Sequence, residues 1–336
     1  MGVHVLDNYY LAITLLITVA YQLLFFAIAF SLKFDKLTDF AGGTNFALLA
    51  IITLSFSSAD PSTVPSARQI VVSLFLIIWA LRLSGFLLFR ILKTGKDDRF
   101  DDKRDKFFPF LGFWVAQMAW VWIVSLPVTL LNSPNVQQYR QPRFGSGRDI
   151  AGVVLFVLGF AMEAFSDVQK YRFKVAHQGE RGTVCDVGLF RFTRHPNYFG
   201  EILLQFAIFM IAVSPAATGA VRGQAYKALY ASILGPFFLT ILLLFVSGLT
   251  LQERPGAKKR YESGENWAGY KKWLDNTSIL FPLPPQVWGR LPTIVKRTVG
   301  LEFPIYVFDP AKHADQKKVA DRESEEGLRE GQPQSS

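Results

Sequence analysis

The residues best suited to chemistry lie in one stretch, from Gly188 to Glu201, which leads into an apolar segment from Ile202 to Val213. From Arg194 onward this stretch reads Arg-His-Pro-Asn-Tyr-Phe-Gly-Glu. Ionisable groups bunched where a chain enters an apolar environment suit the capture of a charged ligand that lies against an apolar one. The same residues could instead form an interfacial belt of Arg and Tyr that anchors the apolar segment.

The order of these residues favours a helix that begins within the stretch. Pro196 suits the first turn of a helix, because that position needs no amide donor. The free amides and the positive dipole end of the helix would then attract an anion. Asparagine can hydrogen-bond a carboxamide in both senses, and tyrosine can stack or donate. The candidate binding residues here are Arg194, His195, Asn197, Tyr198, Gly200 and Glu201.

Two further groups of residues could contribute to the same site. If an upstream helix continues past Ser166, Asp167, Lys170 and Lys174 fall on one face, where two ammoniums can hold phosphates. The alternative is pairing of Asp167 with Lys170 on a helix surface. Downstream, basic residues alternate with rings between residues 251 and 273, which suits either a nucleotide or an anionic membrane surface. The aromatic candidates in this second group are Trp267 and Tyr270.

The elements that must position these residues are membrane spans. Half of the 336 residues are hydrophobic, and several charge-free runs exceed the roughly 20 residues that cross hydrocarbon. We predict an all-α membrane protein with about seven transmembrane helices, near residues 9–32, 44–58, 69–89, 107–131, 150–166, 199–214 and 228–251.

The distribution of basic residues predicts the orientation of these spans. Lysine and arginine collect in the loops that follow spans one, three, five and seven, and cytoplasmic loops carry this excess. The N-terminus is therefore predicted to be outside or lumenal and the C-terminus cytosolic. The net charge of +9 is thereby attributed mostly to basic residues in the cytoplasmic loops, so we expect no nucleic-acid partner.

Several other classes of site are not indicated. The single cysteine, Cys185, excludes an intrachain disulfide, and the four histidines are too scattered for a metal site of ordinary spacing. The run from Gly145 to Arg148 lacks the third glycine of a dinucleotide-binding loop. We predict three regions: 1–146 with the N-terminal spans on the substrate side, 147–285 with the cofactor, and a cytosolic tail, 286–336, disordered from about Asp309.

The run from Arg194 to Glu201 resembles the C-terminal signature of the membrane sterol and steroid reductases, which comprise the steroid 5-alpha-reductase family and the sterol C14-reductase group. The Gln169-Lys170 run is similar to one in the sterol C14-reductases, and Ser166-Asp167 to a pair in the steroid reductases. Trp267 and Tyr270 resemble the reductase C-terminus. The likeness covers about 147–285, more loosely 38–131, and points to an uncharacterised branch of that superfamily.

This resemblance implies an NADPH-dependent reductase in the endoplasmic reticulum that acts in lipid metabolism. Hydride would pass to a carbon-carbon double bond of a small lipophilic, steroid- or lipid-like substrate. The family pattern assigns cofactor contacts to Asp167, Lys170, Lys174, Arg194, Asn197, Tyr198, Glu253 and Tyr270. The catalytic glutamate and tyrosine of the steroid reductases are not found, since Asp39 and Trp79 occupy only roughly similar regions. The catalytic residues therefore stay unassigned.

Two other functions compete with this reading. Isoprenylcysteine and phospholipid methyltransferases share an Arg-His-Pro-x-Tyr start and a later Glu, but use S-adenosylmethionine. Asn197, the Gly200-Glu201 pair and the Gln169-Lys170 run favour the reductase. A non-enzymatic membrane protein that binds lipids is the third possibility, although it leaves the polar cluster at the sixth span unexplained.

Overall fold

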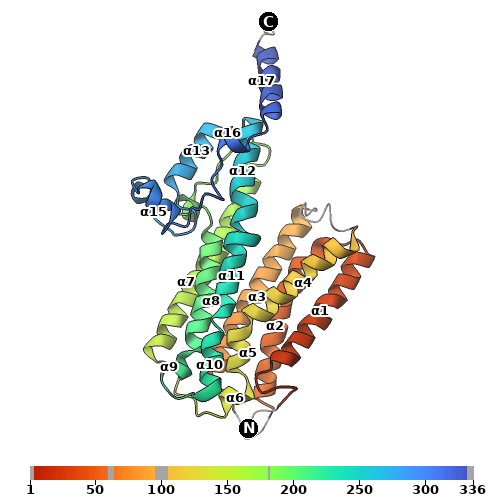
Figure 1. Cartoon of the computed structure of the whole chain (residues 1–336), viewed down its shortest axis with the longest axis vertical. Helices are drawn as coiled ribbons and strands as arrows, with labels where there is room; N and C mark the ends of the chain where they lie inside the picture. The colour runs from red at the N-terminus through yellow and green to blue at the C-terminus, as the bar shows by residue number, and fades with distance from the viewer. Residues whose placement is uncertain (1–3, 60–63, 95–104, 181, 331–336) are drawn as a thin grey trace. The chain divides into compact units, whose positions relative to one another are not determined.

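The computed structural model of the chain describes residues 4–59, 64–94, 105–180 and 182–330. Over these residues the chain forms helices joined by turns and loops, without a strand (Figure 1). The helices are α1 (Leu11–Ser31), the 3-10 helix η1 (Asp35–Leu37), α2 (Thr38–Ser57), α3 (Ala67–Thr94), α4 (Phe107–Val124), α5 (Leu126–Leu131), α6 (Pro134–Gln137), α7 (Gly147–Ala176), the 3-10 helix η3 (Gly188–Arg191), α8 (Pro196–Ala212), α9 (Ser214–Ala217), α10 (Gly223–Ala231), α11 (Leu234–Ile241), the π-helix η4 (Leu242–Val246), α12 (Leu249–Ser263), α13 (Trp267–Asn276), α14 (Pro285–Trp288), α15 (Thr293–Arg297), α16 (Pro310–His313) and α17 (Gln316–Glu330).

The predicted fold class is confirmed. Within the described residues, six helical segments are long and apolar enough to cross a membrane: α1, α2, α3, α4, α7 and the stretch from Gly223 to Ser263. The shorter α8 is also apolar and supplies a seventh. The chain is therefore an all-α membrane protein with about seven spans, and the orientation of its termini stays a prediction.

Two of the predicted spans are interrupted. The span predicted at 107–131 divides into α4 and α5 at Ser125, and Pro127 lies in the first turn of α5. Proline is tolerated there because its missing amide would have no helical partner. The span predicted at 228–251 divides into α10, α11, η4 and α12, with Ser232 ending the first of these. Residues 242–246 adopt the wider π-helical turn.

The chain packs into two compact units that are described separately here. The first unit contains residues 1–158 and 202–239, and the second contains residues 159–201 and 240–336. The first part of α7 therefore belongs to the first unit and its last part to the second. The predicted regions, with boundaries at residues 146 and 285, were divided by role and not by packing. They stay a prediction.

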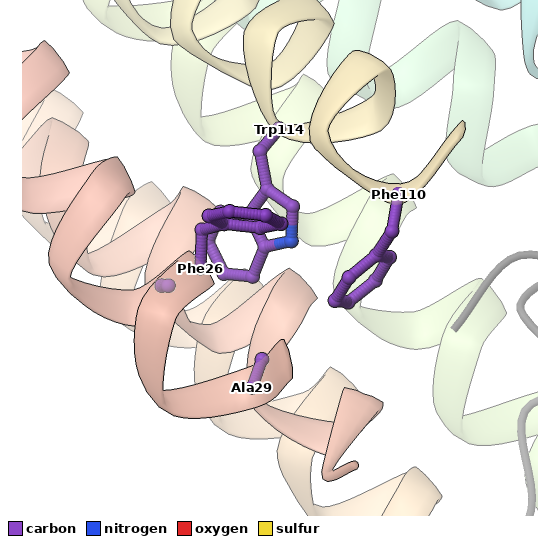
Figure 2. Packing of buried hydrophobic residues seen from close by; sticks show 5 residues of the cluster. Phe26, Ala29, Phe110 and Trp114 are labelled. Carbon is purple, nitrogen blue, oxygen red and sulfur yellow. The ribbon is translucent and has the colours of Figure 1, made fainter. Parts of the chain in front are cut away.

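One buried cluster of the first unit consists mainly of aromatic side chains of α1 and α4. Figure 2 shows the Phe26 ring close to Trp114, with Phe110 from the same helix as Trp114 beside them and Ala29 one turn further along α1. The Phe26 ring centre is 6.3 Å from that of Trp114 and 5.8 Å from that of Phe110. Contacts join α1 with α2 and α4, and α2 with α3, so these helices form one bundle.

Two buried polar groups add specific links to the first unit. The Gln117 amide donates to Gln22 Oε1 at 2.8 Å, and the Gln22 amide donates to Asn45 Oδ1 at 3.0 Å, which joins α4, α1 and α2. Amide hydrogen bonds of this kind hold transmembrane helices together because lipid offers the groups no partner. In addition, Arg68 at the start of α3 pairs with Asp149 at the start of α7.

The second unit contains the C-terminal segment, which the structure shows as folded. Composition predicts disorder from about Asp309, but the structure describes α16 and α17 there, and both lie against α12 (Figure 1). Val319 is 7% exposed, and Arg322 donates from Nη1 to the Tyr261 carbonyl at 2.9 Å. These tertiary contacts stabilise a helix whose composition alone would leave it exposed. Residues 331–336 lie outside the described residues.

Candidate functional site

The loop before α8 is pinned to a distant part of the second unit. The amide of Arg194 donates to the Ser278 carbonyl at 2.8 Å, and the Thr193 hydroxyl donates to the Leu280 carbonyl at 2.9 Å. The helix α8 then begins at Pro196, which confirms the predicted helix start. The backbone is held by these hydrogen bonds before His195 and by α8 after it. The side chains of Arg194 and His195 point inward, and each residue is only 5% exposed.

The buried groups form one charged cluster. The Glu253 carboxylate, on α12, accepts from Arg194 Nη1 at 2.5 Å and lies 2.6 Å from His195 Nε2. Arg194 Nη2 forms a second ion pair with Glu302. We call Arg194, His195, Glu253 and Glu302 the Arg194 cluster. Burying ionisable side chains is costly, and such clusters are found at functional sites more often than elsewhere in a fold.

The protonation of His195 follows from its surroundings. Burial lowers the pKa of His195 below its ordinary value of 6.5, against the opposing effect of the Glu253 carboxylate. The ring is therefore neutral at pH 7, and its proton lies on Nε2, where the carboxylate accepts it. The lone pair on Nδ1 is then an acceptor, and that buried atom has no hydrogen-bond partner within the described chain. The Tyr198 ring stacks on the imidazole, with centres 5.1 Å apart.

Aromatic and basic side chains surround the Arg194 cluster. The Tyr270 ring centre lies 4.5 Å from the Arg260 guanidinium carbon. Burial raises the pKa of Tyr270 to about 12, and the nearby Glu253 charge adds to this shift, so its hydroxyl stays protonated. The Trp267 ring packs at 5.3 Å from Tyr261 and 5.6 Å from Phe308.

A cavity of about 440 Å³ opens beside the cluster. Arg194, Glu253 and Glu302 contribute to its wall, together with the rings of Trp267 and Phe308. The remaining lining residues come from α12, from α13 and from the segment that follows α14, and five of them are charged: Lys271, Asp275, Lys296, Arg297 and Asp309. A cavity lined by rings and by both signs of charge suits a ligand that is partly aromatic and partly ionic.

Comparison with known proteins gives one match. The family described as protein of unknown function (DUF1295) matches residues 25–274, about three quarters of the chain. The chain belongs to the DUF1295 family. No curated protein matches it, and no solved structure does. The DUF1295 match includes Arg194, His195 and Glu253, and it ends before Glu302.

Six of the predicted residues gather at or near the Arg194 cluster. Arg194 and Glu253 line the cavity with Trp267, and His195 is hydrogen-bonded to Glu253 beside them. Tyr270 is close enough for the charges of Glu253 and Arg194 to act on its hydroxyl. The remaining one, Lys170, stands over the Phe190 ring at 5.8 Å, and its charge acts on His195 and Glu253.

Four predicted residues follow the cluster along the first two turns of α8 and do not line the cavity. The Tyr198 hydroxyl accepts from the Gln252 amide, and Asn197 Oδ1 is buried without a partner in the described chain. A Cβ on Gly200 would lie 2.6 Å from the Gly159 carbonyl oxygen of α7, so this glycine allows α7 and α8 to meet. Glu201 is also buried.

The last two predicted residues, Asp167 and Lys174, lie on α7 outside the lining of this cavity. Asp167 is half-buried and Lys174 is exposed. Their predicted contact with phosphate stays a prediction, because no ligand is present to test it. Among the described residues, no group of three or more His, Cys, Asp or Glu is arranged to hold a metal ion.

Sequence reasoning missed the contribution of the C-terminal segment. Glu302, Tyr306 and Phe308 all belong to the region predicted as a tail, yet each of them lines the cavity. A signal was present: residues 301–308 read Leu-Glu-Phe-Pro-Ile-Tyr-Val-Phe, an aromatic and apolar run that differs from the charged residues after it. Such a run predicts burial, although it does not say against what.

Proposed function

We propose that this protein is an integral-membrane, NADPH-dependent reductase of a carbon-carbon double bond in a lipophilic, steroid- or lipid-like substrate. The observation that carries the proposal is the buried Arg194–His195–Glu253 arrangement at the start of α8, beside a cavity with aromatic and basic walls. The resemblance of Arg194 to Glu201 to the sterol and steroid reductases supports the same reading. We further propose that the protein resides in the endoplasmic reticulum.

The donor set of the site fits a phosphorylated dinucleotide. Arg194 is a planar guanidinium that matches phosphate oxygens, and its Nε atom is buried without a partner in the described chain. His195 Nδ1 can accept a hydrogen bond from a carboxamide, and Asn197 Oδ1 offers a second buried acceptor. Trp267 and Phe308 provide ring faces for stacking in the cavity wall.

In this proposal the chain binds and orients, and the cofactor supplies the hydride. Glu253 holds Arg194 and His195 in fixed positions through two short contacts of 2.5 and 2.6 Å. It also keeps the His195 proton on Nε2, so that the other nitrogen presents a lone pair. The protonated Tyr270 hydroxyl stays neutral across physiological pH. The proton donor to the substrate carbon stays unassigned.

One observation also fits an S-adenosylmethionine-dependent methyltransferase. Glu253 and Glu302 place two carboxylates near the rings of Trp267 and Phe308, and such a wall attracts a sulfonium cation. The Arg-His-Pro-x-Tyr start and the later Glu253 are likewise shared with the isoprenylcysteine type. This function is therefore the second candidate, and non-enzymatic lipid binding is the third.

A comparison of cofactors in the purified protein separates these candidates. We expect NADPH to raise the unfolding temperature of the detergent-solubilised protein in a concentration-dependent way. At a concentration 100 times Kd, the free energy of unfolding should rise by about 2.7 kcal/mol. S-adenosylmethionine should cause no saturable shift. Stabilisation by S-adenosylmethionine alone would support the methyltransferase, and stabilisation by neither compound would favour the lipid-binding protein.

The lysines of α7 are predicted to recognise the 2′-phosphate that distinguishes NADPH from NADH. We expect the double substitution Lys170→Ala and Lys174→Ala to weaken NADPH binding by about tenfold and NADH binding much less, since two charge-assisted contacts are lost. Titration of both cofactors measures this difference. Lys259→Ala, which removes an exposed lysine of α12, is the matched control. Equal losses for both cofactors would show that these lysines do not read the 2′-phosphate.

A further inference from the structure

Arg194 forms ion pairs with two carboxylates, which come from different parts of the chain. Glu253 belongs to α12 and lies within the region that matches the family, whereas Glu302 lies beyond that region. The side chain of Glu253 is 5% exposed and that of Glu302 is 18% exposed. One carboxylate is sufficient to neutralise one guanidinium. The second therefore requires a separate explanation.

Residues 301–306, which we call the Glu302 segment, are docked on the end of the last span. The Tyr306 hydroxyl donates to the Leu244 carbonyl of η4 at 2.5 Å, and the Phe303 ring stacks on Phe245 with centres 5.7 Å apart. Arg254 Nη2 donates to the Pro304 carbonyl at 2.6 Å. The Glu302 segment thus reaches Arg194 through a small number of contacts with η4 and α12.

The backbone at the start of the Glu302 segment is strained. Leu301 has a φ of +59°, in the left-handed region that a leucine rarely adopts. This conformation turns the chain so that the next side chain, Glu302, faces Arg194. Burial raises the pKa of Glu302, although the Arg194 charge opposes the shift. Strain and burial both oppose the docked position, which is therefore held by the ion pair and by the contacts with η4 and α12.

The ion pair between Glu302 and Arg194 resembles the contact of an arginine with a bound anion. A carboxylate on the edge of a guanidinium occupies the place that a phosphate oxygen takes in a ligand complex. Arg194 and Glu302 both line the cavity, so their contact lies where a ligand would enter. Glu253 contacts His195 as well as Arg194, whereas among the described residues Glu302 forms an ion pair with Arg194 alone and feels the charge of Lys296 without pairing with it.

We propose that Glu302 stands in for an anionic group of the ligand, and that the Glu302 segment leaves Arg194 when a phosphorylated ligand binds. This inference rests on the proposed function, in which that group is a phosphate of the dinucleotide. The C-terminal segment then acts as an internal competitor that the ligand must displace. Free phosphorylated compounds and the dinucleotide share this chemistry, and the experiment below tests each.

The test uses the full-length protein in detergent and compares Glu302→Gln with the wild type. Glutamine keeps the size of the side chain and removes its charge. We expect Glu302→Gln to bind NADPH and inorganic pyrophosphate at least about fivefold more tightly, because less competition remains. We also expect faster hydrogen exchange in the amides of the Glu302 segment without ligand. Glu180→Gln, which removes an exposed carboxylate elsewhere in the second unit, should leave both affinities unchanged.

A second variant weakens the docking of the Glu302 segment without changing an ion-pair partner of Arg194. Phe303→Ala removes the ring that packs on Phe245 and leaves every member of the Arg194 cluster in place. It should also tighten binding of both ligands, because the docked position is weakened. Unchanged or weaker binding in Glu302→Gln and Phe303→Ala would overturn the inference, since Glu302 would then support the site.

The outcomes separate this inference from the proposed function. If NADPH binds to no form of the protein but pyrophosphate binds more tightly to Glu302→Gln, the cofactor assignment fails and the competition by Glu302 stands. If NADPH binds equally to the wild type and to Glu302→Gln, the cofactor assignment stands and the competition is refuted. If neither compound binds to any form, Arg194 is not an anion site and both proposals fail.

Discussion

Replacing Glu253 by alanine is expected to lower the free energy of unfolding by about 3–5 kcal/mol and to abolish NADPH binding. The Glu253 carboxylate accepts from Arg194 at 2.5 Å and from His195 at 2.6 Å, and all three side chains are buried. Its removal leaves a guanidinium with one partner fewer and the His195 Nε2 proton with no acceptor. A buried charge that loses its partner costs far more than an exposed one.

Thermal and denaturant unfolding in detergent measure the loss of stability, and titration with NADPH measures the loss of binding. Glu253→Gln should fall between the wild type and Glu253→Ala, because an amide oxygen can still accept one hydrogen bond. Glu262→Gln on the same helix is the control. Glu262 pairs with Lys258 at 3.6 Å and accepts from the Asp315 amide at 2.8 Å. The glutamine oxygen can still accept from that amide, so the substitution loses only the ion pair and should cost less than about 1 kcal/mol. Equal stability of Glu253→Ala and Glu262→Gln would show that the buried cluster does not hold this unit together.

The spans were predictable because hydropathy is a local property. A run of apolar residues of sufficient length crosses a membrane whatever it packs against, and α1, α2, α3 and α7 lie where the sequence placed them. Local chemistry also fixed the start of α8 at Pro196. The interruptions at Ser125 and in η4 were not foreseen, because the residues around them are as apolar as the rest of the spans.

The site was predictable only in part, because it joins segments that are far apart along the chain. The run from Arg194 to Glu201 drew attention through its polar residues, and Glu253 was identified through a resemblance. No local pattern indicates that Glu302 contacts Arg194 across 108 residues. The composition of the C-terminal segment as a whole is polar and charged, and this average concealed the short apolar run around Tyr306.

At Gly200 the structure shows which part of the chain uses the space that a glycine leaves. A glycine at this position lets another group approach closely. In the structure the space is taken by α7, because a Cβ would meet the Gly159 carbonyl oxygen at 2.6 Å and the Glu163 amide nitrogen at 2.8 Å. The glycine therefore positions α8 against α7, and the site gains from this indirectly because Arg194 and His195 precede the same helix.

In the first unit, replacing Asp149 by alanine is expected to cost about 3–5 kcal/mol of unfolding free energy. Both side chains of the Arg68–Asp149 pair are 0% exposed. Arg68 Nη2 donates to Asp149 Oδ2 at 2.7 Å and Nε donates to Oδ1 at 3.0 Å, so the pair is bidentate. Asp149 also accepts from the Ser146 hydroxyl at 2.9 Å. Its loss leaves a buried guanidinium that keeps only the Pro142 and Arg143 carbonyls.

A double-mutant cycle distinguishes this cost from a general loss of packing. Arg68→Met should also destabilise the protein, because it leaves the Asp149 carboxylate without its bidentate partner. The double variant Arg68→Met with Asp149→Ala should cost clearly less than the sum of the two single changes, since it leaves no buried charge unpaired. Additive costs would mean that the two side chains contribute through packing and not through their ion pair. The pair would then tie α3 to α7 by shape alone, and its charges could be replaced by apolar residues without loss.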